Sequence, residues 1–182
     1  MYLANILFSI IIIILLYQIY IIKINYNNNI SISNIICNLK NNNLYYSLIA
    51  LFITVVLYEY YRNDYITLTL TSTLLLLLIK LICTIDHSLE HQFIAILIFL
   101  CINIFMFYNV NKINNNILEY SIIFQLIVII YVIKIIDINK IFTCEEYRKN
   151  LNIFLPETFL IINFGFFYIY LHYLQFIKIK YS

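Results

Sequence analysis

The chain has 182 residues, of which 64% are hydrophobic and only 11% charged, with a formal net charge of +2. Soluble domains are roughly 45–50% apolar and about 25% charged, so a soluble fold of this size could not cover so much apolar surface. The basic residues are few and form no long run, which excludes a nucleic-acid partner. Composition therefore indicates an integral membrane protein whose first partner is the lipid bilayer.

The first uncharged block covers residues 3–22. At about 1.5 Å per residue it is long enough to cross a hydrocarbon core of about 30 Å. It also exceeds the apolar core of about 7 to 15 residues that is typical of a signal peptide, and no Lys or Arg precedes it. We therefore expect a retained transmembrane helix, followed by a polar, Asn-rich loop that contains Ser31 and Ser33.

The second and third apolar blocks cover residues 44–61 and 65–85. The second block ends in tyrosines, which we expect to form an aromatic belt at headgroup level. The third opens with TLTLTSTL, an alternation typical of a strand. The leucine run behind it and the membrane setting favour a helix instead. The tyrosines of the expected belt are Tyr58, Tyr60 and Tyr61.

Three further blocks cover residues 92–110, 117–136 and 157–177. A charged stretch, residues 137–152, separates the last two, and Pro156 stands at the entry to the last one, where a helix tolerates proline. The sequence thus predicts an all-α polytopic membrane protein, a single domain built as a bundle of about six transmembrane helices. The distribution of Lys and Arg among the loops favours termini outside the cytosol.

Four ionisable residues lie within six positions between the third and fourth blocks: Asp86, His87, Glu90 and His91. If this turn is helical, His87 and His91 share a face, a spacing suited to two imidazole ligands on one metal. A solvated interfacial turn is the simpler alternative. His172 lies inside the last block, where an ionisable group is either functional or hydrogen-bonded near the interface by a tyrosine.

The remaining candidates each have a structural alternative. Glu157 stands at the start of the last block, where a helix dipole favours a carboxylate by about 0.3–1 kcal/mol. Gly165, the single glycine, offers a close contact between helices. Ser31 and Ser33 can be helix caps, loop residues, or a nucleophile and its neighbour. No nucleophile elbow, phosphate-binding loop, HExxH or CxxC motif occurs, which argues against an enzyme, and we expect no cofactor.

Four short motifs follow one another along the chain. They are Ser31-Ile32-Ser33, Tyr61-Arg62, the set Asp86, His91, Ala95 and Phe99, and Glu157 followed by Gly165-Phe166-Phe167-Tyr168. In this order they resemble the Frag/DRAM/Sfk family of six-span membrane proteins, which includes autophagy modulators and Golgi proteins of GPI-anchor lipid remodelling. The sequence departs from the family pattern at Ile94, where a glycine is usual, and at Thr158, where an aromatic residue is usual. The gap between the glutamate and the glycine also looks about two residues long.

The resemblance implies a non-enzymatic or lipid-handling protein of the endomembrane system (Golgi, endoplasmic reticulum or lysosome-like), with cytosolic termini. It also implies a polar pocket at one membrane surface. Two alternatives remain open: a small structural subunit bound to other proteins of an organellar inner membrane, and an intramembrane metal-dependent hydrolase of lipid amide or ester bonds. The pocket candidates are Ser31, Ser33, His91 and Glu157, and the metal candidates are Asp86, His87, His91 and His172.

Overall fold

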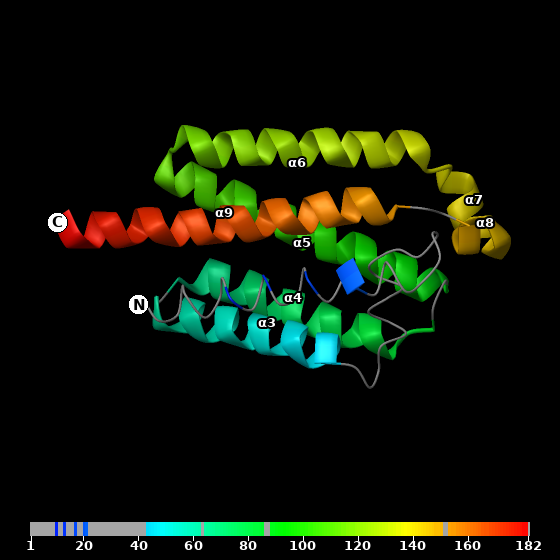
Figure 1. Ribbon diagram of the computed structural model, residues 1–182, viewed down its shortest axis with the longest axis horizontal. Helices are drawn as coiled ribbons and strands as arrows, with labels where there is room; N and C mark the ends of the chain where they lie inside the picture. Colours follow the sequence, from blue (N-terminus) through cyan, green and yellow to red (C-terminus); the bar gives the residue numbers. More distant parts are fainter. Residues whose placement is uncertain are drawn as a thin grey trace.

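The computed structural model describes residues 10, 13, 17, 20, 21, 43–62, 64–85, 88–150 and 153–181. These residues form α-helices joined by short connections, and no strand occurs among them. Figure 1 shows long helices lying roughly along one axis, with two short helices at one end. The helices are α3 Asn43–Tyr61, α4 Tyr65–Cys83, α5 Leu89–Ile113, α6 Asn116–Ile135, α7 Ile138–Thr143, α8 Glu145–Asn150 and α9 Phe154–Tyr181.

Helix α5 lies at the centre of the packing. It contacts α4, α6 and α9, while α3 packs against α4 and α6 packs against α9. In Figure 1 the α6–α9 pair and the α3–α4 pair lie on opposite sides of the molecule, and α5 crosses obliquely from one pair to the other. The core between them is built from large apolar side chains with no exposed surface, among them Leu74, Phe105, Leu118, Phe167 and Leu171.

Four helices are long and apolar enough to cross a membrane: α4, α5, α6 and residues Phe154–Gln175 of α9. They coincide with the predicted blocks 65–85, 92–110, 117–136 and 157–177, so the all-α membrane architecture is confirmed at this level. Their outward faces carry exposed Ile, Leu, Phe and Tyr side chains, as expected of helices that contact lipid.

The two remaining predicted blocks are described unequally. Helix α3 covers the block 44–61. Of the block 3–22 the structure describes only isolated positions, which are helical and exposed, and the rest lies outside the described residues. The described positions of this block are Ile10, Ile13, Tyr17, Tyr20 and Ile21.

The threonine-rich start of α4 is helical, as expected from its membrane setting. The hydroxyls of Thr69, Thr71 and Thr73 donate to the carbonyl oxygens of Tyr65, Thr67 and Thr69 at 2.7, 2.9 and 2.8 Å. Each bond joins residues four apart, so the side chains satisfy their own polarity within the helix. The segment is therefore helical although Thr and Leu alternate in it as they would in a strand.

The connection between α5 and α6 has only two residues. Asn114 ends α5 with φ 49°, the left-handed conformation that asparagine tolerates better than most residues. The side chain of Asn115 then begins α6 by accepting from the amides of Ile117 and Leu118 at 3.0 and 3.4 Å. Because the connection is so short, α5 and α6 are antiparallel neighbours. The last turn of α5 consequently lies at the same end of the bundle as the α3–α4 connection (Figure 1).

Candidate functional site at one end of the bundle

The α3–α4 connection brings two carboxylates together. Helix α3 ends where the amide of Arg62 donates to the carbonyl oxygens of Tyr58 and Glu59, both at 3.2 Å. Asp64 then begins α4, because its carboxylate accepts from the amide of Thr67 at 3.3 Å as an N-cap. Glu59 and Arg62 are three residues apart on one helical face, so their side chains can pair.

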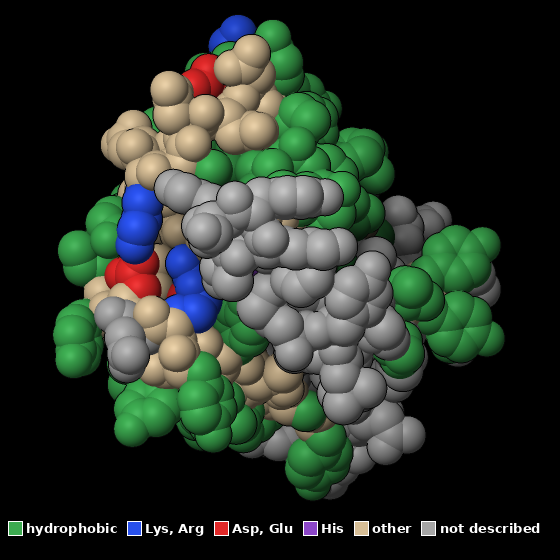
Figure 2. All heavy atoms as spheres, turned by 90° about the vertical axis from the view of Figure 1, so that its left-hand side faces the viewer, with side chains coloured by type: hydrophobic (Ala, Val, Ile, Leu, Met, Phe, Trp, Pro, Cys, Tyr) green, Lys and Arg blue, Asp and Glu red, His purple; other side chains and the backbone are tan. Residues whose placement is uncertain are grey.

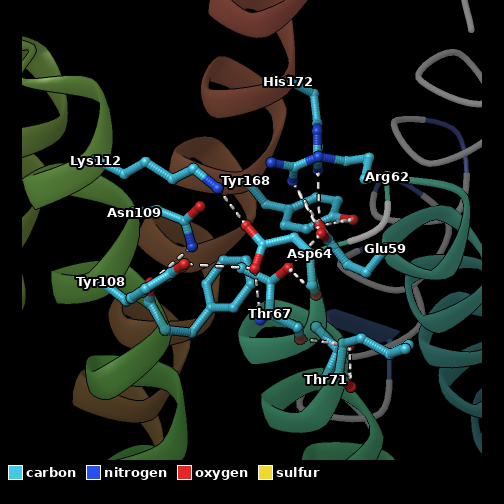
Figure 3. Close-up of polar contacts among 12 residues, drawn as sticks. Glu59, Arg62, Asp64, Thr67, Thr71, Tyr108, Asn109, Lys112, Tyr168 and His172 are labelled. Atoms are coloured by element: carbon cyan, nitrogen blue, oxygen red, sulfur yellow. Dashed lines mark hydrogen bonds and ion pairs between the residues drawn. The ribbon is translucent and has the colours of Figure 1, made fainter.

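Glu59 is completely buried, and its carboxylate accepts hydrogen bonds from three directions (Figure 3). Arg62 Nη1 lies 3.1 Å from Oε1 and 2.9 Å from Oε2. The hydroxyl of Thr67 on α4 donates to Oε2 at 2.8 Å, and the hydroxyl of Tyr168 on α9 donates to Oε1 at 3.3 Å. One carboxylate thus joins α3, α4 and α9.

His172 completes the buried side of this site. Its Nε2 lies 3.6 Å from Oε1 of Glu59, and its side chain is only 2% exposed. The ring sits edge-on between Tyr58 and Tyr168, with centroid distances of 4.4 and 4.1 Å. Tyr58 therefore turns inward, unlike the predicted belt partners Tyr60 and Tyr61, which are 63% and 81% exposed.

Asp64 forms the second ion pair, with Lys112 from the last turn of α5. Lys112 Nζ lies 2.6 Å from Oδ2 of Asp64, and the hydroxyl of Tyr108 donates to Oδ1 at 3.4 Å. Burial raises the pKa of the Asp64 carboxyl, but the hydrogen bonds from Lys112 and Thr67 and the charges of Lys112 and Arg62 outweigh it. The pKa of Asp64 consequently lies below its ordinary value of 3.8.

Together these residues form what we call the ionic cluster: Glu59, Arg62, Asp64, Thr67, Tyr108, Lys112, Tyr168 and His172. Figure 2, which looks onto this end of the molecule, shows acidic and basic side chains gathered at one side of its face. A buried ion pair adds little net stability over apolar residues, yet removing one partner costs about 3–5 kcal/mol because the other charge stays buried. The cluster therefore holds α3, α4, α5 and α9 together at this end.

The carboxylates of the ionic cluster are poorly placed for acid–base chemistry. Both oxygens of Glu59 accept hydrogen bonds, and both oxygens of Asp64 do so as well. A general base needs a lone pair directed at a substrate. The cations of the cluster are more accessible than the carboxylates, because the side chains of Arg62 and Lys112 are 18% and 50% exposed and face the surface.

The opposite end of the bundle holds the other predicted site residues that the structure describes. His91 is completely buried in the first turn of α5, where its amide donates to Ser88 Oγ at 3.1 Å. Its Nδ1 lies 3.3 Å from the hydroxyl of Thr84. Glu157 lies in the first turn of α9, as its sequence position predicts, and it is 4% exposed. Both helices begin at this end of the bundle (Figure 1).

The structure separates two of the four predicted metal candidates. His172 lies near the start of α4, because it packs against Glu59, and Glu59 is bonded to Thr67. His91 lies near the other end of α4, because it contacts Thr84. At about 1.5 Å per residue, positions 67 and 84 are roughly 25 Å apart along the helix. Among the described residues, no group of three or more His, Cys, Asp or Glu could hold a metal ion.

The other candidates lie outside the described residues. These are Asp86 and His87 of the metal set and Ser31 and Ser33 of the pocket set. A shared pocket of the two serines with His91 and Glu157, and metal binding near His87, accordingly stay predictions.

Sequence reasoning singled out His172 but missed its principal partner. Glu59 and Asp64 are not among the predicted site residues, and Arg62 is named only as part of the Tyr61-Arg62 motif, although three charges within six residues between two apolar blocks are unusual. The spacing of Glu59 and Arg62, three apart at a helix end, is the local signal that could have found the pair. Nothing local pointed to Lys112 or Tyr168, which come from other helices.

Fold and site together define a polytopic helical membrane protein with a buried ionic cluster at one end of its bundle. Comparisons of the chain with protein-family models, with curated proteins and with solved structures find no match.

Proposed function

We propose that this chain is a six-span, non-enzymatic membrane protein of the endomembrane system that holds or presents lipid, as its resemblance to Frag/DRAM/Sfk proteins implies. The observation that carries the proposal is the saturation of Glu59, whose two oxygens accept from Arg62, Thr67 and Tyr168. A buried carboxylate used in this way is a structural tie between helices. The exposed apolar faces of the spanning helices supply the lipid contact.

The lipid-handling proposal is tested on the full chain, purified in detergent and reconstituted into nanodiscs. Mass spectrometry of the extract counts the lipids that remain bound and detects any hydrolysed product. We expect intact lipid to be retained and no ester or amide cleavage over hours of incubation. Accumulation of lyso-lipid or free fatty acid would overturn the non-enzymatic assignment and favour the hydrolase.

The predicted pocket is tested separately by alanine substitution of Ser33, His91 and Glu157. If the three residues share one pocket, each substitution lowers lipid retention, and the effects do not add. Substituting Leu76, which is 66% exposed on α4, is the matched control for a change on the lipid-facing surface. Loss of lipid in the Leu76 variant alone would contradict the pocket.

The topology is tested by glycosylation mapping. With six spans both termini lie on one face of the membrane, and the α3–α4 and α5–α6 connections lie on that face too. Acceptor sites placed at both ends of the chain should therefore give the same result. A structural subunit of a larger complex, the second candidate, would be indicated by partner proteins that co-purify in fixed ratio.

A further inference from the structure

The cations of the ionic cluster have hydrogen-bonding capacity that the cluster does not use. Arginine carries five N–H donors and lysine three. Within the described part of the chain, the side chain of Arg62 donates only through Nη1, to Glu59, and the side chain of Lys112 donates to Asp64. The Nε and Nη2 groups of Arg62 and the remaining donors of Lys112 are thus available to a ligand.

Both cations are held in place by the acids behind them. Glu59 is completely buried and the side chain of Asp64 is 7% exposed, whereas their partners reach outward. The hydroxyl of Thr67 lies 2.8 Å from Glu59 Oε2 and 3.1 Å from the carbonyl oxygen of Asp64, so the two ion pairs are neighbours. Figure 3 shows the side chains of Arg62 and Lys112 above the two carboxylates. A preorganised pair of cations loses little entropy when it binds an anion.

A second observation comes from Asn109, which precedes Lys112 by one helical turn on α5. Its side chain is completely buried and donates to the carbonyl oxygen of Phe105 at 2.9 Å. Its Oδ1 has no hydrogen-bond partner among the residues that the structure describes. Figure 3 shows the amide beside Lys112, turned toward the cluster. A buried acceptor without a donor is costly, and a ligand hydroxyl would relieve that cost.

The position of the ionic cluster indicates which kind of anion it binds. Tyrosines gather at membrane–water interfaces, at the level of the lipid headgroups. Tyr60, Tyr61 and Tyr65, which flank the α3–α4 connection, are 63%, 81% and 78% exposed. Arg62 and Lys112 thus lie at the level of lipid phosphates, and a planar guanidinium binds phosphate through two parallel hydrogen bonds.

We propose that Arg62 and Lys112 bind the phosphate of an anionic lipid headgroup at this end of the bundle, with Asn109 accepting from a headgroup hydroxyl. The proposal rests on the proposed lipid-handling function and names the class of lipid and the residues that hold it. Phosphatidylglycerol, which is anionic and carries hydroxyls, is the simplest probe.

Native mass spectrometry of the full chain, titrated with phosphatidylglycerol, phosphatidylcholine or inorganic phosphate, tests the site. We expect phosphatidylglycerol to bind about tenfold more tightly than phosphatidylcholine, a difference that corresponds to one good charge-assisted contact. Arg62→Lys keeps the positive charge beside Glu59 but loses the planar guanidinium that makes two parallel hydrogen bonds. Lys112→Gln removes the second cation. Both variants should lose most of this preference. Lys80→Gln, which removes an exposed, ion-paired lysine at the opposite end, should keep it.

The outcomes separate the two proposals. Equal retention of phosphatidylglycerol in all variants would overturn the site while leaving lipid handling in place, and failure to retain any lipid would overturn both. Binding of inorganic phosphate without a lipid preference would show that the anion is not a headgroup. Thermal unfolding of each variant, followed by circular dichroism, ensures that a loss of binding is read only from folded protein.

Discussion

Glu59 and Glu90 lie at opposite ends of the same bundle and are both paired with a cation, yet their surroundings differ completely. The side chain of Glu59 is fully buried and pairs with Arg62 at 2.9 Å, whereas Glu90 is 57% exposed and pairs with Lys80 at 2.8 Å. The distances are nearly equal, so geometry alone does not distinguish the pairs. Burial does, because water screens the second pair and is excluded from the first. The energetic role of an ion pair in this protein follows from where its acid lies.

The largest effect should come from removing a cation while its acid stays buried. Arg62→Leu leaves Glu59 without its charge partner, and we expect a loss of about 3–5 kcal/mol in the free energy of unfolding. The measurement is denaturation by SDS in mixed micelles, followed by circular dichroism.

The double variant Glu59→Leu/Arg62→Leu provides the decisive control for this pair. It removes both charges and should recover most of the lost stability, because no uncompensated charge remains in the interior. If the double variant is as unstable as Arg62→Leu, lost packing and not the unpaired carboxylate determines the effect.

A smaller loss is expected at the start of α4, where Asp64 both caps the helix and pairs with Lys112. Asp64→Ala removes the acceptor for the Thr67 amide, and N-cap removal typically costs about 0.5–2 kcal/mol. Asp64→Asn keeps an acceptor for that amide, so it measures the contribution of the charge alone. The same denaturation experiment should therefore rank wild type above the Asn variant and the Asn variant above the Ala variant. An Ala variant that matches wild type would show that the cap is dispensable.

The charge of Asp64 also predicts a pH dependence. Because its pKa is lower in the folded protein than its ordinary value of 3.8, the ionised form is favoured by folding. Its contribution is complete above that ordinary value and is lost as the pH falls through the folded-state pKa. The stability difference between wild type and Asp64→Asn should hold from about pH 7 to about pH 5 and shrink below about pH 4. A difference that grows on acidification would contradict the lowered pKa.

Much of the fold follows from hydropathy, but the cluster does not. The blocks 65–85, 92–110, 117–136 and 157–177 can be read locally, because crossing a membrane demands a continuous apolar stretch in each helix separately. The partners of Glu59 depend instead on which helix ends meet. Tyr168 is 109 residues away, and Lys112 lies 48 residues beyond Asp64. No spacing rule links residues so distant, so the pairing of Glu59 with Arg62 could be found from local spacing, whereas the contacts of Glu59 with Tyr168 and His172 could not.

Helices α6 and α9 are held together by polar contacts between uncharged side chains, unlike the ionic cluster. Asn163 donates to Gln125 Oε1 at 2.8 Å and to the carbonyl oxygen of Ser121 at 2.9 Å, and it accepts from the Ser121 hydroxyl at 2.8 Å. Hydrogen bonds between membrane helices contribute about 0.6 kcal/mol on average and about 1.7 kcal/mol at most. Asn163→Leu should therefore cost less than Arg62→Leu in the same assay. An equal or larger loss would mean that buried amides matter as much as buried charges here.

The smallest effect is expected for the exposed ion pair between Lys80 and Glu90. Lys80→Gln removes a contact as short as that of Arg62, yet both side chains are more than half exposed, and either charge left alone remains hydrated. The midpoint of denaturation should not change measurably, and raising the salt concentration should not separate the variant from wild type. The matching experiment at the other end is Arg62→Gln, which removes a cation from a fully buried carboxylate. If Lys80→Gln destabilised the protein as strongly as Arg62→Gln, burial of the acid would not be what distinguishes the two ends.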